Sequence, residues 1–187
     1  MKKNLPRYSF FICSIFSALL ASSQTDRFAY AITDITKEGA NWSSLRRIDL
    51  KTGAFSEVLL NGNDASSLAY DDATQKQMNE PFTDARFGKT ANAAFGTGVA
   101  AIAYDKRNNR LYYTPMFINQ LRYIDLKTMK VYFVPTSDNT GLQIKANDQS
   151  NIITRMTIGA DGNGYALSND GNHLLRFTTG KKLPLQI

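Results

Sequence analysis

Residues 45–60 read LRRIDLKTGAFSEVLL, and residues 121–135 repeat this pattern as LRYIDLKTMKVYFVP. A looser third copy, LLRFTTGKKLPLQI, occupies residues 174–187. Each copy holds two short apolar runs joined by a turn around Lys-Thr or Thr-Gly, which is typical of a β-hairpin. Gly53 supplies the positive φ that a tight hairpin favours. Met129 takes the equivalent place in the second copy, so we expect that turn either to differ or to carry strain.

The repeat extends upstream of these hairpins. Residues 99–114 read VAAIAYDKRNNRLYYT and align with residues 153–168, ITRMTIGADGNGYALS, so that Ile102 matches Met156. Each segment holds two apolar runs separated by a turn rich in Asp, Asn and Gly, which is a hairpin signal. One repeat unit therefore contains four strands: two joined by the polar turn, followed by two joined by the turn around Lys-Thr or Thr-Gly.

This order of elements, at about 40 to 50 residues per unit, predicts an all-β fold. We expect a β-propeller-like repeat of four-stranded antiparallel blades. The units lie at about 28–60, 99–135 and 151–187, and an insertion at about 72–98 holds either one helical turn or a long ordered loop. The first unit lacks its opening strand, and residues 66–71, SSLAYD, resemble the start of another one.

The number of repeat units determines whether a propeller ring can close. A closed propeller typically has about 4 to 8 blades, so three units predict an incomplete ring. We interpret the sequence as a fragment or a truncated gene product. The alternative is a smaller open sheet or sandwich that needs no closure.

The first 23 residues predict a cleavable signal peptide. A basic start precedes the apolar run FFICSIFSALLA at 10–21, and the small residues Ala21 and Ser23 lie just before the expected cut. The run is shorter than the roughly 20 residues of a spanning helix, although an uncleaved anchor is the alternative. We expect residues 24–187 to form the exported domain, secreted, periplasmic or at the cell surface, with no membrane span after cleavage.

Charge and cysteine content limit the function classes. The chain has 22 Lys and Arg against 16 Asp and Glu, but three of the basic residues belong to the leader, which leaves a net charge of +3. The remaining basic residues are scattered, and nucleic-acid binding requires them to cluster. The one cysteine, Cys13, leaves with the leader, so the exported domain has no disulfide and no thiol chemistry. No cofactor is evident.

Two segments resemble a known family. LYYTP and LRYIDLKT within 111–128, and YALSNDGNHLLRFTTG at 165–180, resemble the blades of NHL-type and related six-bladed secreted propellers. The chain also resembles uncharacterised secreted proteins of Bacteroidota-type bacteria. The resemblance covers about 28–60 and 99–187 and implies architecture rather than function, because such propellers include both lactonase-like enzymes and binding surfaces. Lactonase-like propellers hold a metal with acidic and amide side chains, which match no position here.

Four patterns suggest chemistry, but each is better explained as structure. His173 lies in a predicted turn, and no G-x-S-x-G elbow is present for a catalytic triad. The turn at 161–164 lacks the ligand spacing of a calcium loop. Asp71 and Asp72, with Asp64 nearby, are read as solvated turn carboxylates rather than an acid/base pair. The small residues at 91–98 have no following Lys-Ser or Lys-Thr, so they do not form a phosphate loop.

Aromatic residues on matching loops suggest a ligand platform. Trp42 lies in the loop between the runs at 28–33 and 45–50, and the equivalent loop of the second unit contains Met116 and Phe117. Aromatic side chains on one face can bind a sugar ring or a peptide, although packing between blades is the interpretation that we favour for these residues. The candidate ligand-binding residues are Trp42, Tyr112, Met116, Phe117 and Arg86, with Tyr113, Asn119 and Gln120 nearby.

We therefore favour an exported, non-catalytic binding domain whose partner is an extracytoplasmic protein or glycan. A metal-dependent, lactonase-like propeller hydrolase is the first alternative. The second alternative is a fragment of a longer propeller protein without a function of its own.

Overall fold

The described part of the chain consists of β-strands and turns. The computed structural model describes residues 27–35, 42–62, 64, 66–78, 83–84, 88–89, 93–96, 98–116, 120–134, 150 and 152–180. These residues contain no helix, which confirms the all-β class, and so none that could span a membrane. The strands are β1 (Phe28–Thr33), β2 (Ser44–Asp49), β3 (Leu60–Asn61), β4 (Tyr70–Asp71), β5 (Thr83–Asp84), β6 (Gly88–Lys89), β7 (Val99–Asp105), β8 (Arg110–Pro115), β9 (Arg122–Asp125), β10 (Lys130–Phe133), β11 (Ile153–Ile158), β12 (Asn163–Ser168) and β13 (Leu174–Thr178).

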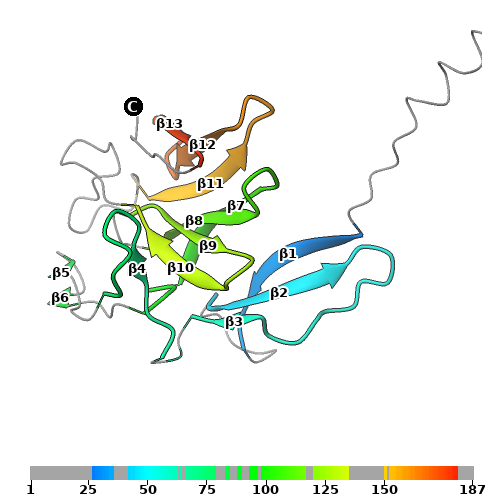
Figure 1. The fold of residues 1–187 in the computed structure, drawn as a ribbon. Helices are drawn as coiled ribbons and strands as arrows, with labels where there is room; N and C mark the ends of the chain where they lie inside the picture. Colours follow the sequence, from blue (N-terminus) through cyan, green and yellow to red (C-terminus); the bar gives the residue numbers. More distant parts are fainter. Residues whose placement is uncertain are drawn as a thin grey trace, which may run out of the picture.

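Three sheets account for most of these strands (Figure 1). The first sheet has the order β1-β2-β3, the central sheet β4-β10-β9-β8-β7, and the third sheet β11-β12-β13. All pairs within them are antiparallel except β4 with β10, which is parallel. β5 and β6 form a separate two-stranded ladder. The three sheets are open rather than closed.

Several details differ from the expectation of uniform four-stranded blades. Residues 66–71 do not open a unit, because β4 forms the parallel edge of the central sheet and a short hairpin with Gln77. The central sheet therefore has five strands, whereas the first and third sheets have three each among the described residues. The expected last strand at 181–187 and the leader 1–23 lie outside the described residues. The insertion at 72–98 holds turns and the β5–β6 ladder where it is described, with no helical turn there.

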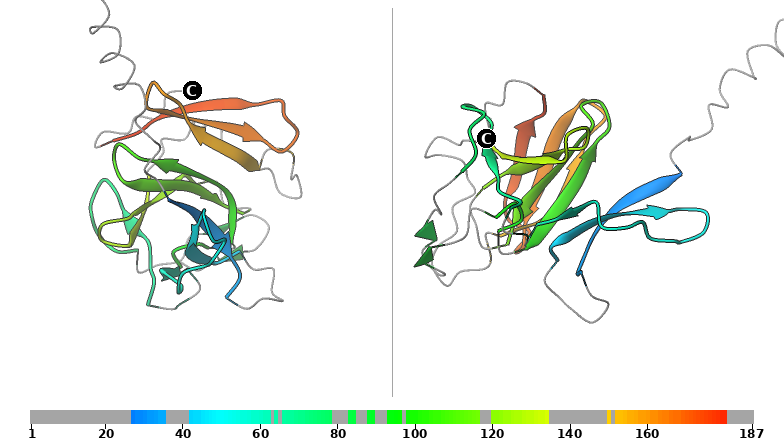
Figure 2. Two further views of the ribbon diagram at one scale, coloured as in Figure 1. Left: turned by 90° about the vertical axis from the view of Figure 1, so that its right-hand side faces the viewer. Right: turned by 60° about the horizontal axis from the view of Figure 1, so that its bottom comes forward.

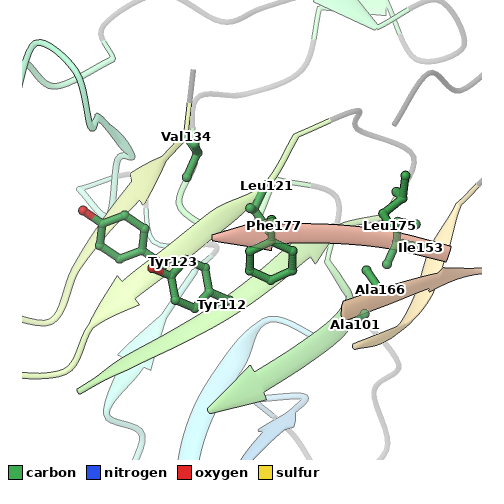
Figure 3. Close-up of a cluster of buried hydrophobic side chains, with 9 residues drawn as sticks. All are labelled: Ala101, Tyr112, Leu121, Tyr123, Val134, Ile153, Ala166, Leu175 and Phe177. Carbon is green, nitrogen blue, oxygen red and sulfur yellow. The ribbon is translucent and has the colours of Figure 1, made fainter. Parts of the chain in front are cut away.

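The central sheet is covered on both faces. Figure 2 shows the three sheets one above another, with the central sheet between the other two. Two clusters of buried side chains fill the interfaces. The cluster toward the third sheet is drawn in Figure 3 and comprises Ala101, Tyr112, Leu121, Tyr123, Val134, Ile153, Ala166, Leu175 and Phe177. The cluster toward the first sheet comprises Leu45, Ala69, Ala94, Phe95, Val99, Leu111, Tyr113, Ile124 and Val131.

The sequence of β8 shows why the sheets stack. Successive side chains of a strand point to opposite faces of its sheet. Tyr112 accordingly packs toward the third sheet and Tyr113 toward the first, and both are fully buried. A strand that is buried on both faces reads as a continuous apolar run rather than an alternating one. The loose alternation of the sequence is thus a consequence of the layered packing.

One turn recurs four times. Asp49, Asp71, Asp105 and Asp125 each begin it, and each carboxylate accepts hydrogen bonds from the backbone N–H groups two and three residues later. The residue four positions after each aspartate has a positive φ: Gly53 (72°), Gln75 (58°), Asn109 (51°) and Met129 (56°). Met129 therefore adopts the same conformation as Gly53, at the cost of backbone strain, as the sequence led us to expect.

Gly53 allows the cost of this conformation to be measured. A Cβ added at Gly53 meets no atom within 4 Å, so only the backbone penalises a side chain there. We expect Gly53→Ala to lower the free energy of unfolding by about 1 kcal/mol. Gly53→Asn should cost less, because asparagine tolerates the left-handed region, as Asn109 does. Urea unfolding measures both, and an alanine variant as stable as the parent contradicts the assignment.

Candidate functional site

A cleft lies between one edge strand of each of the three sheets. β1, β7 and β11 are each an edge strand of their sheet, and they follow one another along one side of the molecule (Figure 1). The cleft has a volume of about 510 Å³, within the range of ligand pockets. Its lining is mainly apolar and aromatic and consists of Tyr30, Ala31, Ile32, Trp42, Val99, Ala100, Ala101, Ile102, Thr154, Arg155 and Met156.

Trp42 stands at this cleft with half of its surface, 49%, exposed. Its φ is 48°, a region that a bulky side chain rarely adopts. Hydrogen bonds fix the backbone on both sides: Val99 N–H donates to the Trp42 carbonyl (3.2 Å), and Ser43 N–H donates to the Thr33 carbonyl (3.1 Å). The fold therefore holds a large aromatic ring in the open at the cost of a strained backbone, a combination that is typical of binding sites.

The cleft combines this ring with a phenol and a single cation. Tyr30 is partly buried, which raises the pKa of its hydroxyl, and its ring contacts that of Tyr104 edge to face at 5.4 Å. On the opposite strand Arg155 is exposed, and its guanidinium makes long hydrogen bonds to the Thr154 hydroxyl (3.4 Å) and the Ser168 carbonyl (3.5 Å). This arrangement suits an apolar ligand that also carries a negative charge.

The structure brings Trp42 and Met116 to the same end of the fold. Gly98 accepts a hydrogen bond from Met116 N–H (2.8 Å), and its neighbour Val99 donates to Trp42. The loops of Trp42 and Met116, which hold equivalent positions in the sequence repeat, are thus linked through Gly98 and Val99. Met116 is only partly exposed and is not among the residues lining the cleft. Phe117, Arg86 and Asn119 lie outside the described residues.

Tyr112 is not a surface residue, and its prediction as a ligand contact is wrong. Its ring is fully buried between those of Tyr123 (5.5 Å between centroids) and Phe177 (5.4 Å), as Figure 3 shows. Burial raises the pKa of its hydroxyl, which contacts Arg110 and the backbone N–H of Gly180 (both 3.4 Å). Tyr113 is equally buried on the other face. Both tyrosines are core residues because both faces of β8 are covered.

Residues that suggested catalysis are engaged in turns. Asp161 accepts hydrogen bonds from the backbone and side chain of Asn163 and from the Tyr165 hydroxyl, which together lower its pKa to about 2. Asp72 accepts a hydrogen bond from the Tyr123 hydroxyl (2.5 Å). His173 is exposed in the turn between β12 and β13. Within the described ranges, no three His, Cys, Asp or Glu side chains are grouped as metal ligands.

A second, smaller cleft lies at the start of β1. It has a volume of about 350 Å³ and is lined by Arg27, Phe28, Arg47, Asp49, Ala54, Phe55 and Ser56. The Arg47 guanidinium lies over the Phe28 ring, 5.1 Å from its centroid, and Asp49 is held in its turn. Arg47 and Asp49 therefore already have partners within the protein.

The sequence did not single out most of the cleft. Ile32 and Arg155 lie within predicted strands, where nothing distinguishes them from other half-buried positions. The alignment of Ile102 with Met156 was the one available signal, because the structure places both residues in the cleft on equivalent edge strands. The other lining residues could be identified only from the way in which the sheets stack.

Comparisons with known proteins identify no family. No protein-family model matches the chain, and no curated protein matches it. Similar solved structures include auxiliary nutrient binding proteins from Bacteroides thetaiotaomicron (13% identity, TM-score 0.36) and Bacteroides ovatus (12% identity, TM-score 0.35). Each alignment covers 75% of this chain and 35% of the other, so the chain spans about a third of their length. At these values the similarity carries no argument about ligand or activity.

Proposed function

We propose that this protein is an exported, non-catalytic binding protein whose ligand occupies the cleft between β1, β7 and β11. The observation that carries the proposal is Trp42, a half-exposed ring on a strained backbone at the mouth of an apolar cleft. Tryptophan is enriched among the residues that contribute most to binding. The predicted signal peptide at 1–23 supports a site of action outside the cytoplasm.

The proposal extends to the architecture. We infer that the three sheets are successive blades of an incomplete propeller. In this inference β7 and β11 are the strands nearest its axis, and β1 is the innermost described strand of a blade that lacks its opening strand. The stacking of the sheets face to face supports this inference, as does the antiparallel run of β7, β8, β9 and β10 in chain order. In this arrangement the cleft is the part of the central channel that these units enclose.

Trp42 is the only tryptophan of the chain and therefore reports directly on the cleft. We would titrate the protein with a panel of blocked peptides and neutral and acidic oligosaccharides while following tryptophan emission. Calorimetry would then compare each ligand found with the variant Trp42→Ala. We expect this variant to bind about thirtyfold more weakly, which corresponds to about 2 kcal/mol for the loss of a central aromatic contact.

Leu174→Ala is the matched control. Leu174 is also an exposed apolar side chain (69%), but it lies on β13 and not among the residues lining the cleft. Its substitution should leave the affinity unchanged. Equal affinities of Trp42→Ala and the parent protein would remove the basis of the proposal.

A further inference from the structure

We infer that the cleft recognises an extended, acidic and apolar peptide segment, which pairs through its backbone with the free edge of β1. This inference rests on the proposed function and specifies the class of its ligand. Addition of a strand to a sheet edge is a common mode of peptide recognition, because main-chain hydrogen bonds supply affinity and alternate side chains supply selectivity. The register of each edge strand with its neighbour determines which of its backbone groups point into the cleft.

The register of β1 with β2 determines the direction of its backbone groups. Leu50 N–H donates to the Arg27 carbonyl (2.8 Å), which makes the opposed residues Phe28 and Asp49 a non-hydrogen-bonded pair. Positions alternate along the strand, so Tyr30 and Ile32 also occupy non-hydrogen-bonded positions. Their N–H and C=O groups consequently point away from β2. In the described part of the chain β1 has no strand on that side.

β7 has the same geometry. Leu126 N–H donates to the Asn109 carbonyl (3.1 Å), so Arg110 and the alternate residues after it on β8 direct their backbone groups toward β7. Ala101 and Ala103 therefore form hydrogen-bonded pairs with Thr114 and Tyr112, their partners in the register. The backbone groups of the intervening Ile102 therefore point away from β8.

β11 completes the pattern. Gly159 N–H donates to the Asn163 carbonyl (2.8 Å), which makes Ile158 and Gly164 a non-hydrogen-bonded pair. By alternation the N–H and C=O groups of Met156 point away from β12. The cleft is therefore bordered by three strand edges whose outward residues, Ile32, Ile102 and Met156, are also lining residues.

The three strand edges around the cleft favour a peptide ligand over a sugar. Outward N–H and C=O groups recur along a strand every two residues, about 6.8 Å, and another extended backbone matches that spacing directly. Of the three edges, that of β1 is the most accessible. The residues of β7 alternate with buried ones and β11 lies against β7, whereas no residue of β1 is buried. A strand on β1 would place its alternate side chains against the apolar cleft and the Trp42 ring.

The charge of the cleft indicates an acidic residue in the peptide. Among its described lining residues, Arg155 is the one charged side chain. Arg155 is exposed, and the hydrogen bonds that its guanidinium makes to described residues are long. A carboxylate on the peptide would give this cation a partner. Arg155→Gln should accordingly weaken a peptide that contains glutamate about threefold and leave the glutamine version of the same peptide unaffected.

The decisive experiment uses N-methylated peptides. The probe is a hexapeptide, Val-Thr-Val-Thr-Val-Glu, with blocked ends, and binding is followed by Trp42 emission. Two further forms carry N-methyl groups on one or the other alternating set of amides. Because only one edge of a paired strand faces the protein, we expect methylation of one set to lower the affinity at least about tenfold and methylation of the other set to leave it within about twofold.

A variant of the protein tests the same contact from the other side. Ile32→Pro removes one outward N–H, at an edge position where proline is tolerated, whereas Ile32→Ala removes the side chain and keeps the N–H. We expect the proline variant to bind the hexapeptide about tenfold more weakly than the alanine variant. Circular dichroism tests whether both variants are folded. If the proline variant is unfolded, the N-methylated peptides alone test the backbone contact.

The outcomes separate this inference from the proposed function. Equal binding of both methylated forms overturns the inference. A change in Trp42 emission with oligosaccharides but not with the hexapeptide also overturns it, but in that case the proposed binding function stands. If neither the hexapeptide nor any oligosaccharide binds, the result counts against both the inference and the proposed function. A concentration-dependent dimer that Ile32→Pro abolishes, without peptide binding, shows that the occupant is a second copy of the chain.

Discussion

Arg122→Ala is expected to lower the free energy of unfolding by about 3 to 5 kcal/mol. The guanidinium of Arg122 is fully buried on β9, and burial lowers its pKa. Its Nη1 donates to the carbonyls of Ala93 (2.7 Å) and Ala94 (2.6 Å), and its Nε donates to Gln120 Oε1 (2.7 Å). The arginine thereby fixes the 93–96 segment, which includes the buried Phe95, against the central sheet.

The magnitude follows from two effects. Truncation of a large buried side chain to alanine costs about 2 to 5 kcal/mol through lost contacts and the cavity left behind. A buried acceptor left without its donor costs about 1 to 3 kcal/mol more, although the Tyr113 hydroxyl still donates to Ala94 (2.5 Å) and offsets part of this loss. Urea unfolding measures the change. Arg176→Ala, at an exposed position of β13, is the control and should stay within about 0.5 kcal/mol. A loss below about 1 kcal/mol for Arg122→Ala contradicts the assigned role.

The second large effect is expected at Gly164 on β12. Gly164 lies opposite Phe177 of β13, and the aromatic ring covers the glycine so closely that a Cβ there would overlap three of its carbons. Phe177 belongs to the core between the central and third sheets (Figure 3), where its side chain is buried. We expect Gly164→Ala to lower the free energy of unfolding by about 2 to 3 kcal/mol through overpacking.

A double-mutant cycle isolates this overlap. Phe177→Leu alone should destabilise the protein, because it removes part of a buried ring. In the presence of Phe177→Leu, however, Gly164→Ala should cost at least about 1 kcal/mol less than in the parent protein. Chemical denaturation of the four proteins gives the coupling energy. Additive effects, within about 0.3 to 0.5 kcal/mol, show that the ring does not rest on Gly164.

Local features of the fold were predictable from the sequence. The run FAYAIT gave the bounds of β1, and the Asp-Leu-Lys-Thr pattern located the turns after β2 and β9. These features depend on neighbouring residues only: an aspartate that accepts hydrogen bonds from two backbone N–H groups, and a residue four positions later that adopts a positive φ. The expectation for Met129 held because the turn is determined by Asp125, and the side chain at the fifth position adds strain without changing the turn type.

Features that depend on sheet stacking were not predictable. Adjacent tyrosines in β8 point to opposite faces, and the sequence does not reveal that both faces are covered; Tyr112 was therefore placed wrongly at a ligand platform. The parallel pairing of β4 with β10 joins segments about sixty residues apart, which no local pattern encodes. The cleft depends on the same long-range arrangement, so Trp42 was recognised by its loop while Arg155 and Ile32 were missed.

The central claim is that ligand binds where β1, β7 and β11 converge. The most direct test is a two-dimensional NMR titration of residues 24–187 with the blocked hexapeptide or the tightest oligosaccharide of the panel. We predict that the amide signals of Tyr30, Ile32 and Ile102 and the indole signal of Trp42 shift together and saturate at one concentration. The claim is contradicted if these signals stay in place while ligand-induced shifts appear at the Phe28–Phe55 cleft or on the exposed face of β13.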